Sequence, residues 1–135
     1  MKILGNGDRG CRRGPAEWFT GEVWIDTVLD TAWLGGSARV QAAQVTFTPG
    51  ARTHWHTHPL GQTLYVLSGL GWVQLEGEPK QAIRPGDVVA IAPSENHWHG
   101  AEAGHTMCHL AMQEADATGS PVTWGAAVTD EEYGS

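Results

Sequence analysis

The chain has 135 residues, the usual length of one domain, so the sequence predicts a single domain over residues 1–135. Its hydrophobic content of 41% and charged content of 17% are globular values, and no apolar run is long enough to cross a membrane. Eight Lys and Arg against fifteen Asp and Glu give a net charge of −7, and three of the basic residues crowd together at Arg9, Arg12 and Arg13. This composition excludes a membrane-spanning role and disfavours a nucleic acid as partner.

The first twenty residues carry charges and glycines where a secretory signal would have an apolar segment, so we expect a cytoplasmic protein. The two cysteines, Cys11 and Cys108, fit a reducing compartment. We expect Cys108 to be a packed thiol, and a disulfide between the two is the alternative. The residues before Pro15, 1–14, are expected to be loosely ordered.

Eighteen glycines and seven prolines divide the chain into short apolar runs without a sustained helical period. This pattern predicts an all-β sandwich or barrel of antiparallel strands. In chain order the predicted strands are 22–29, 40–48, 63–67, 72–76, 81–84, 88–92, 97–100 and 106–114. One helical turn is predicted at 129–133, where Thr129 and Glu132 have the spacing of a capping box.

The seven histidines cluster in one stretch, since all of them lie between positions 54 and 109. Alternate residues of a strand share a face, so His54, His56 and His58 can point the same way, as can His97 and His99. Two such strands side by side can gather imidazoles around one cation. A solvated polar edge is the better explanation of a single His-x-His pair, but two groups in one short chain favour a metal site.

Further side chains are predicted to surround such a site. On the last predicted strand, His109, Ala111 and Gln113 share one face, and they would stand in the barrel opposite Ala43 and Val45. An interior histidine such as His109 can be structural or can carry protons, and both interpretations stay open from the residues alone.

Two interpretations also stay open for His99, which shares the face of His97 and could orient a substrate or hydrogen-bond within the cavity wall. Trp55 and Trp98 each separate two histidines, so we expect them to face away from the cation and to pack between sheets or subunits.

One segment has the spacing of a known motif: a glycine, five residues, His-x-His, three residues, a glutamine, six residues and a glycine. These positions are Gly50, His56, His58, Gln62 and Gly69. The segment resembles the first motif of the cupins, with Gln62 in place of the usual glutamate.

A second segment, 86–97, resembles the second cupin motif, although Ser94 and Ala92 stand where glycine and proline are usual. The resemblance implies the cupin double-stranded β-helix, a jelly-roll barrel. It also implies that His56, His58, Gln62 and His97 bind one metal ion, with His54 as a flanking histidine.

A closer resemblance covers nearly the whole chain and is to small bacterial cupins that act as manganese-dependent hydroxynitrile lyases. In that group a glutamine is also the fourth ligand, and a histidine beside the metal on the last strand assists the chemistry; it matches His109. His54 is a departure, because a small apolar residue is usual there. The similar segments are GPAEWFTG (14–21), VTFTPGART (45–53), WHTHPLGQTL (55–64), GDVVAIAPSENHWHGA (86–101), HLAMQE (109–114) and TDEEY (129–133).

The resemblance implies a lyase that cleaves a cyanohydrin, such as mandelonitrile, into an aldehyde and cyanide, or joins the two. The cofactor it implies is one divalent ion, Mn first, with Fe, Ni or Zn as alternatives. A ligand set without a carboxylate leaves the ion its full charge, which makes it a stronger Lewis acid.

The expected site therefore has three parts, namely the metal ligands above, catalytic groups and a substrate pocket. The catalytic groups are His109, His99 and Gln113, and the pocket residues are Ala43, Val45 and Tyr65. The oligomeric states usual among cupins and the surplus of tryptophans suggest a homodimer or homotetramer. Two alternatives stay open: another metal-dependent cupin enzyme, such as a dioxygenase, isomerase or decarboxylase, and a cupin that binds a small ligand without catalysis.

Overall fold

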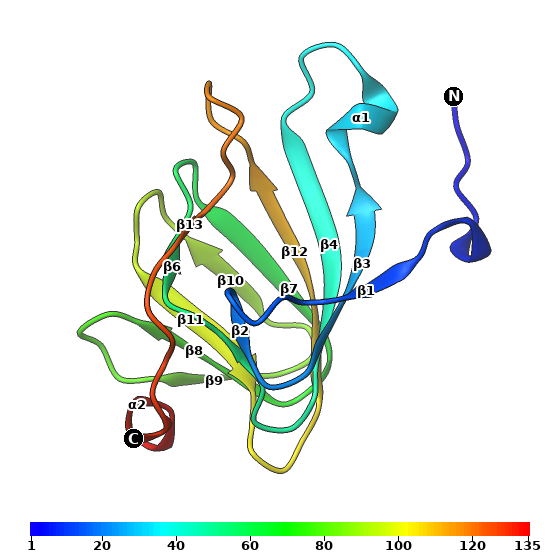
Figure 1. Ribbon diagram of the computed structural model, residues 1–135. Helices are drawn as coiled ribbons and strands as arrows, with labels where there is room; N and C mark the ends of the chain where they lie inside the picture. Colours follow the sequence, from blue (N-terminus) through cyan, green and yellow to red (C-terminus); the bar gives the residue numbers. More distant parts are fainter.

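Two antiparallel sheets face each other and close into a jelly-roll barrel in the computed structural model, which describes residues 1–135 (Figure 1). The first sheet has six strands in the order β1 (Cys11–Arg13), β3 (Val23–Leu29), β4 (Val40–Phe47), β12 (Met107–Glu114), β7 (Gln62–Gly69) and β10 (Val88–Ile91). Strands far apart in sequence are neighbours in it, as β4, β12 and β7 are, which is the crossing pattern of a jelly roll.

The second sheet is built mainly from very short strands. Its path is β13 (Thr123–Trp124), β6 (His56–Thr57), β11 (His97–Ala101), β5 (Arg52–Thr53) and β2 (Phe19–Thr20), and β8 (Gly71–Leu75) joins β11 to β9 (Gln81–Ile83). Three short helices complete the chain: η1 (Asn6–Asp8), α1 (Thr31–Leu34) and α2 (Asp130–Gly134). No helix is both long and apolar enough to span a membrane.

The predicted fold class is confirmed, and all eight predicted strands are present with boundaries within two residues of the prediction. The predicted helical turn is α2. Thr129 caps it through a reciprocal pair of bonds, because its hydroxyl accepts from the Glu132 amide at 3.1 Å and its own amide donates to the Glu132 carboxylate at 2.8 Å.

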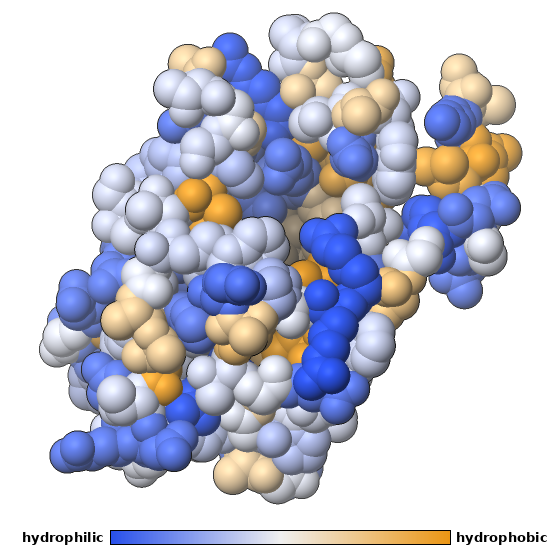
Figure 2. All heavy atoms as spheres, viewed as in Figure 1, coloured by the Kyte–Doolittle hydropathy of each residue, from blue (hydrophilic) through white to orange (hydrophobic).

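The amino-terminal segment differs from the prediction that residues 1–14 are loosely ordered. Cys11–Arg13 forms β1 and pairs with β3, although all three side chains are exposed and give no alternating apolar signal. Residues before β1 extend from the barrel, and Figure 2 shows hydrophobic atoms gathered on this segment, apart from the main body. Met1 and Ile3 in this segment are exposed. The helix α1 was also missed; Asp30 caps its first turn and Gly35 ends it.

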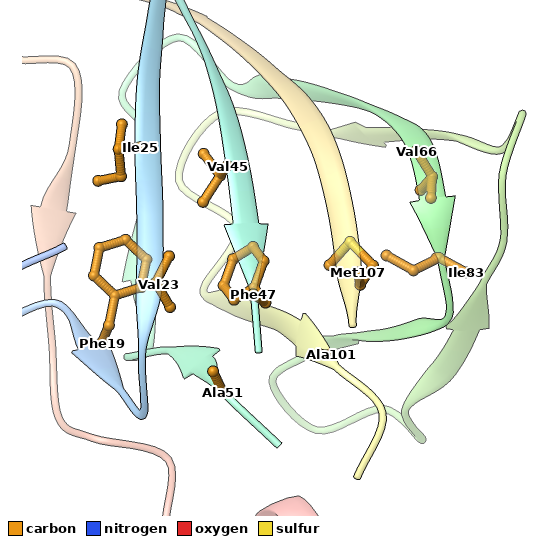
Figure 3. Close-up of a cluster of buried hydrophobic side chains, with 10 residues drawn as sticks. All are labelled: Phe19, Val23, Ile25, Val45, Phe47, Ala51, Val66, Ile83, Ala101 and Met107. Carbon is orange, nitrogen blue, oxygen red and sulfur yellow. The ribbon is translucent and has the colours of Figure 1, made fainter. Parts of the chain in front are cut away.

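Side chains from both sheets form the core of the barrel (Figure 3). The ten members of the main cluster are Phe19, Val23, Ile25, Val45, Phe47, Ala51, Val66, Ile83, Ala101 and Met107. Phe47 is fully buried at its centre and contacts the rings of His99 and His109, with centroids 5.9 and 5.4 Å away. The apolar core therefore forms the floor of the histidine cluster.

The two glycines of the first motif are favoured at their positions for different structural reasons. Gly50 has φ +77°, a left-handed conformation that side chains disfavour, in the turn after β4. Gly69 ends β7 with φ +82°, and a Cβ atom there would lie 1.9 Å from the carbonyl oxygen of Thr106. Of these two glycines, only Gly69 combines an unfavourable φ with a backbone clash.

We expect Gly69→Ala to destabilise the protein more than Gly50→Ala. Both substitutions carry the left-handed penalty of about 1–2 kcal/mol, and Gly69→Ala adds a clash costing a further 1–3 kcal/mol or so. Denaturant unfolding of the two variants measures the difference. Equal loss of unfolding free energy would contradict the role given to the close approach at Gly69.

Candidate metal centre

A cavity of about 220 Å³ is lined by residues of both sheets and of the segment that follows β12. Four histidines line it, His56, His58, His99 and His109, and His97 lies directly behind His56 with ring centroids 4.2 Å apart. All five are at most 4% exposed, and they are called the five buried histidines below. No Asp or Glu lines the cavity and its one charged lining residue is Arg12, so every side chain there that could bind a cation is neutral.

Neighbouring strands bring these residues together. His56 of β6 is the direct cross-strand partner of His97 at the start of β11. His58 follows β6, and its ring centroid lies 5.0 Å from that of His56 and 5.6 Å from that of His97. Gln62 begins β7, opposite Gln113 of β12. The predicted ligands His56, His58, Gln62 and His97 thus lie in one cluster.

Backbone carbonyls set the orientation of three of the imidazoles. The Nδ1 atoms of His56, His58 and His97 lie 2.9, 2.7 and 2.9 Å from carbonyl oxygens of His54, Pro121 and Glu95. A carbonyl can only accept, so each Nδ1 carries the proton and each Nε2 keeps a lone pair. Metal-binding histidines typically have such a bond on the ring nitrogen that does not bind the metal.

Gln62 adds a fourth donor to this set. Its amide nitrogen donates to the side-chain oxygen of Gln113 at 3.2 Å, which turns its own oxygen toward Nε2 of His97, 3.4 Å away. Two acceptors face each other there, and Nε2 of His58 is buried without any partner. A cation would satisfy all three lone pairs, so these residues fit a metal ion.

The tightest grouping in the cluster includes His99. Ring nitrogens of His56, His97 and His99 lie within 4.8 Å of one another, and this three-histidine group could hold a metal ion. His58 is outside that grouping, although the resemblance implied it as a ligand. The hydrogen bonds distinguish the two, because Nδ1 of His99 is not bonded to a carbonyl but lies 3.0 Å from Nε2 of His109.

His99 and His109 form a hydrogen-bonded pair, which contains one shared proton. Nε2 of His99 and Nδ1 of His109, the outer nitrogens of the pair, are both buried without partners. In either tautomer of two neutral rings, one outer nitrogen has a lone pair and the other has an N–H. The pair can therefore accept a proton at one end and donate one at the other.

Burial lowers the pKa values of all five buried histidines. It lowers the pKa of His97 to about 4 and that of His109 to about 4. For His56 and His99, positive charge on neighbouring histidines lowers the pKa further. All five are therefore neutral at pH 7, the form that binds metals and accepts protons.

The remaining wall of the cavity contains most of the predicted pocket residues. Ala43, Val45 and Gln113 line it. Tyr65 does not, and its prediction as a pocket residue is wrong: it lies on the outer face of β7, 42% exposed, while Leu64 and Val66 point inward. Successive residues of a strand face opposite sides, so Tyr65, three residues after the inward-facing Gln62, is expected to face outward.

The structure also places His54 and Trp98 relative to the cavity. His54 lies outside the three-histidine group and contributes its backbone carbonyl to His56. Trp98 faces away from the cavity, fully buried, and donates to Gln74 at 2.7 Å. Pro121 and Trp124, which were not predicted, line the cavity from the end of the chain, 63 and more residues from His58.

Comparisons agree with this architecture. Residues 43–112 match the cupin domain family, so the chain belongs to the cupins. It is 51% identical over 133 residues, 98% of each chain, to the (R)-mandelonitrile lyase of Granulicella tundricola, whose name supports an enzymatic function here. A cupin-like protein from Thermotoga maritima is similar in structure, with a TM-score of 0.84 at 40% identity over 93% of this chain and 91% of that one. A cupin-2 domain protein from Rhodospirillum rubrum shares the fold, with a TM-score of 0.71 at 17% identity over 99% and 84% of the two chains.

We expect His56→Ala and His97→Ala to abolish metal binding and His54→Ala to leave it largely intact. The first two remove an Nε2 donor, whereas His54→Ala keeps the backbone carbonyl that orients His56. Elemental analysis of the three purified variants measures this. Equal metal loss in all three would show that the donors are assigned to the wrong histidines.

The metal-free protein should lose stability as the pH falls from about 6.5 to about 4. The folded state keeps its histidines neutral, while the unfolded chain takes up protons below its ordinary histidine pKa, so stability is full above that value. Unfolding measured across this range should show the loss. His109→Gln should weaken the pH dependence, because it removes one of the buried histidines whose pKa is lowered. A constant unfolding free energy between pH 7 and 4 would contradict the burial effect.

Proposed function

We propose that the protein is a metal-dependent hydroxynitrile lyase, which cleaves a cyanohydrin such as mandelonitrile into an aldehyde and cyanide or forms it from them. The observation that carries the proposal is a carbonyl-oriented histidine set beside a buried pair of hydrogen-bonded histidines in one small cavity. The similarity to a named (R)-mandelonitrile lyase over 98% of the chain supports the same reaction.

His56, His58, Gln62 and His97 would hold the metal ion, with Mn proposed first and Fe, Ni or Zn accepted by the same donors. Bound there, the ion would supply a positive charge that stabilises a developing oxyanion or cyanide. Because the cavity has no carboxylate, none of this charge would be cancelled by the protein.

The His99–His109 pair is proposed to move the proton. In cleavage, the cyanohydrin hydroxyl loses its proton, the bond between the carbinol carbon and the nitrile carbon breaks, and cyanide takes up a proton. A lone pair at one end of the histidine pair accepts the first proton while an N–H at the other end remains available. His109 at this position lines the cavity and is neutral at pH 7, as a base must be.

The size of the cavity favours a small substrate. At about 220 Å³ it is smaller than the ~300–1,000 Å³ typical of drug-sized ligands. Ala43, Val45 and Ala111 form an apolar wall suited to the body of an aldehyde-derived cyanohydrin, and Gln113 offers a polar contact beside it.

The outer face of the first sheet supports association of the chain into the proposed homodimer or homotetramer. Tyr65, Leu67 and Val88 are each at least 42% exposed there, and Tyr65 and Val88 are direct cross-strand partners. Apolar side chains of this size on one exposed face are typical of subunit contacts.

Release of benzaldehyde from mandelonitrile by the manganese-loaded protein tests the proposal directly. We expect turnover in the loaded form and its loss after chelation. Oxygen uptake with diols or flavonols, without benzaldehyde release, would favour the dioxygenase alternative. Stabilisation by a small ligand without any turnover would favour a binding protein.

We expect His109→Ala to keep its metal and to lose roughly 10²- to 10⁴-fold in mandelonitrile turnover, the range usual for a positioned acid or base. Cleavage and synthesis should lose the same factor, because they share one transition state. The measurements are kcat in both directions and metal content. His105→Ala, in an exposed loop, is the matched control. Wild-type turnover with full metal in His109→Ala would make His109 structural.

A further inference from the structure

The carboxyl-terminal tail, residues 121–133, forms part of the metal centre although it contributes none of its ligands. It runs along the second sheet past β6 and ends in α2 (Figure 1). Its Pro121 carbonyl accepts from Nδ1 of His58 at 2.7 Å. Its Trp124, in β13, pairs with His56 of β6, and the two ring centroids are 4.7 Å apart. Two of the proposed ligands therefore take their orientation partly from the tail.

The tail itself is held by few regular hydrogen bonds. Next to β13, the Gly125 amide donates to the Trp55 carbonyl at 2.7 Å and the Trp55 amide donates to the Ala126 carbonyl at 2.9 Å. Beyond these contacts the chain has no strand partner until α2. Its far end must be fixed by side chains.

Arg52 of β5 makes most of these side-chain contacts, and Lys80 adds a bond from its Nζ to the Tyr133 carbonyl. The Nε and Nη2 atoms of Arg52 donate to the carbonyl of Val128 at 3.2 and 2.8 Å, and Nη2 also reaches the carboxylate of Asp130 at 2.7 Å. Its guanidinium lies 4.6 Å from the centre of the Tyr133 ring, and the Tyr133 hydroxyl donates to the Ala101 carbonyl at 2.8 Å. Five contacts thus join this arginine and its aromatic partner to the tail and the barrel.

Burial makes this contact more than an ordinary surface ion pair. The side chain of Arg52 is only 7% exposed, whereas that of Asp130 is 98% exposed, so the ion pair itself is screened by water. A buried cation needs compensating partners, and the Val128 carbonyl and the Tyr133 ring supply them. Both partners belong to the tail, and the one barrel partner, the Gly50 carbonyl, is 3.4 Å from Nη1, so burial of Arg52 depends mainly on a docked tail.

We infer that Arg52 is a positioning residue for the metal centre, acting through the carboxyl-terminal tail to orient His58 and His56. This inference rests on the metal site of the proposed function but not on its lyase activity. With Val128 released, only β13 and the two Trp55 bonds still hold the tail, so the Pro121 carbonyl is held less firmly opposite His58. That imidazole can then rotate or adopt the tautomer with its proton on Nε2. That tautomer has no lone pair for a metal at this position.

Arg52→Met in the full chain tests the inference, because methionine keeps the apolar stem and removes every donor. We expect the manganese affinity to fall about 10- to 100-fold, the effect usual for losing a partner that orients a ligand. In the metal-free variant, histidine nitrogen NMR should show the Nε2–H tautomer of His58, and the amides of Trp124 and Gly125 should exchange faster. Arg52→Lys should restore part of the affinity. Arg84→Met, the same change at an exposed turn, should alter none of these quantities.

Unchanged manganese affinity in folded Arg52→Met would overturn the inference, whether or not the tail amides exchange faster. If Arg52→Met does not fold, Tyr133→Leu removes the ring contact and the bond to Ala101 from a part-exposed position. It should lower manganese affinity in the same direction by a smaller factor, and unchanged affinity there would equally overturn the inference. None of these measurements needs a substrate, so absent mandelonitrile turnover in the wild type would contradict the proposed function alone.

Discussion

The bond from an imidazole Nδ1–H to a backbone carbonyl is the interaction on which the site depends. It recurs three times, at His56, His58 and His97, with carbonyls from three different segments. Each bond settles which nitrogen keeps its lone pair and fixes the plane of the ring. Inside a barrel where burial already lowers the histidine pKa values, the result is a group of neutral lone pairs with little freedom to turn away. Such a group is costly to leave unpartnered, and this cost favours metal binding.

The fold brings to the histidines groups that lie far from them in the sequence. The carbonyl for His58 comes from Pro121, 63 residues away, and is brought there by the tail that Arg52 holds. The floor of the histidine cluster is the ring of Phe47, a member of the apolar core that contacts the rings of His99 and His109. A jelly roll suits this arrangement because its crossovers place distant strands side by side, so short segments of a small domain can converge on one cavity.

Local spacing allowed the strands, the helical turn and the histidine cluster to be predicted, because each depends on neighbours within a few residues. Period two also placed Gln113 and Ala111 in the cavity, and the same rule would have placed Tyr65 outside it. Contacts between distant segments could not be predicted this way. The pairing of exposed Cys11–Arg13 with β3 has no apolar pattern, and the His99–His109 bond depends on how two strands of different sheets face each other.

The amide at position 62 connects the metal site to the substrate pocket in a way that a carboxylate would not require. A carboxylate presents an oxygen to the cluster in either orientation, but an amide does so only when its NH₂ group is engaged elsewhere. In this protein Gln113 engages it, so a residue predicted for the chemistry also orients the fourth donor. Any contact that Gln113 makes in the cavity is therefore coupled to the direction of the Gln62 oxygen. A glutamine at position 62 thus has two results: the donors around the cluster are all neutral, and the direction of the fourth donor depends on Gln113.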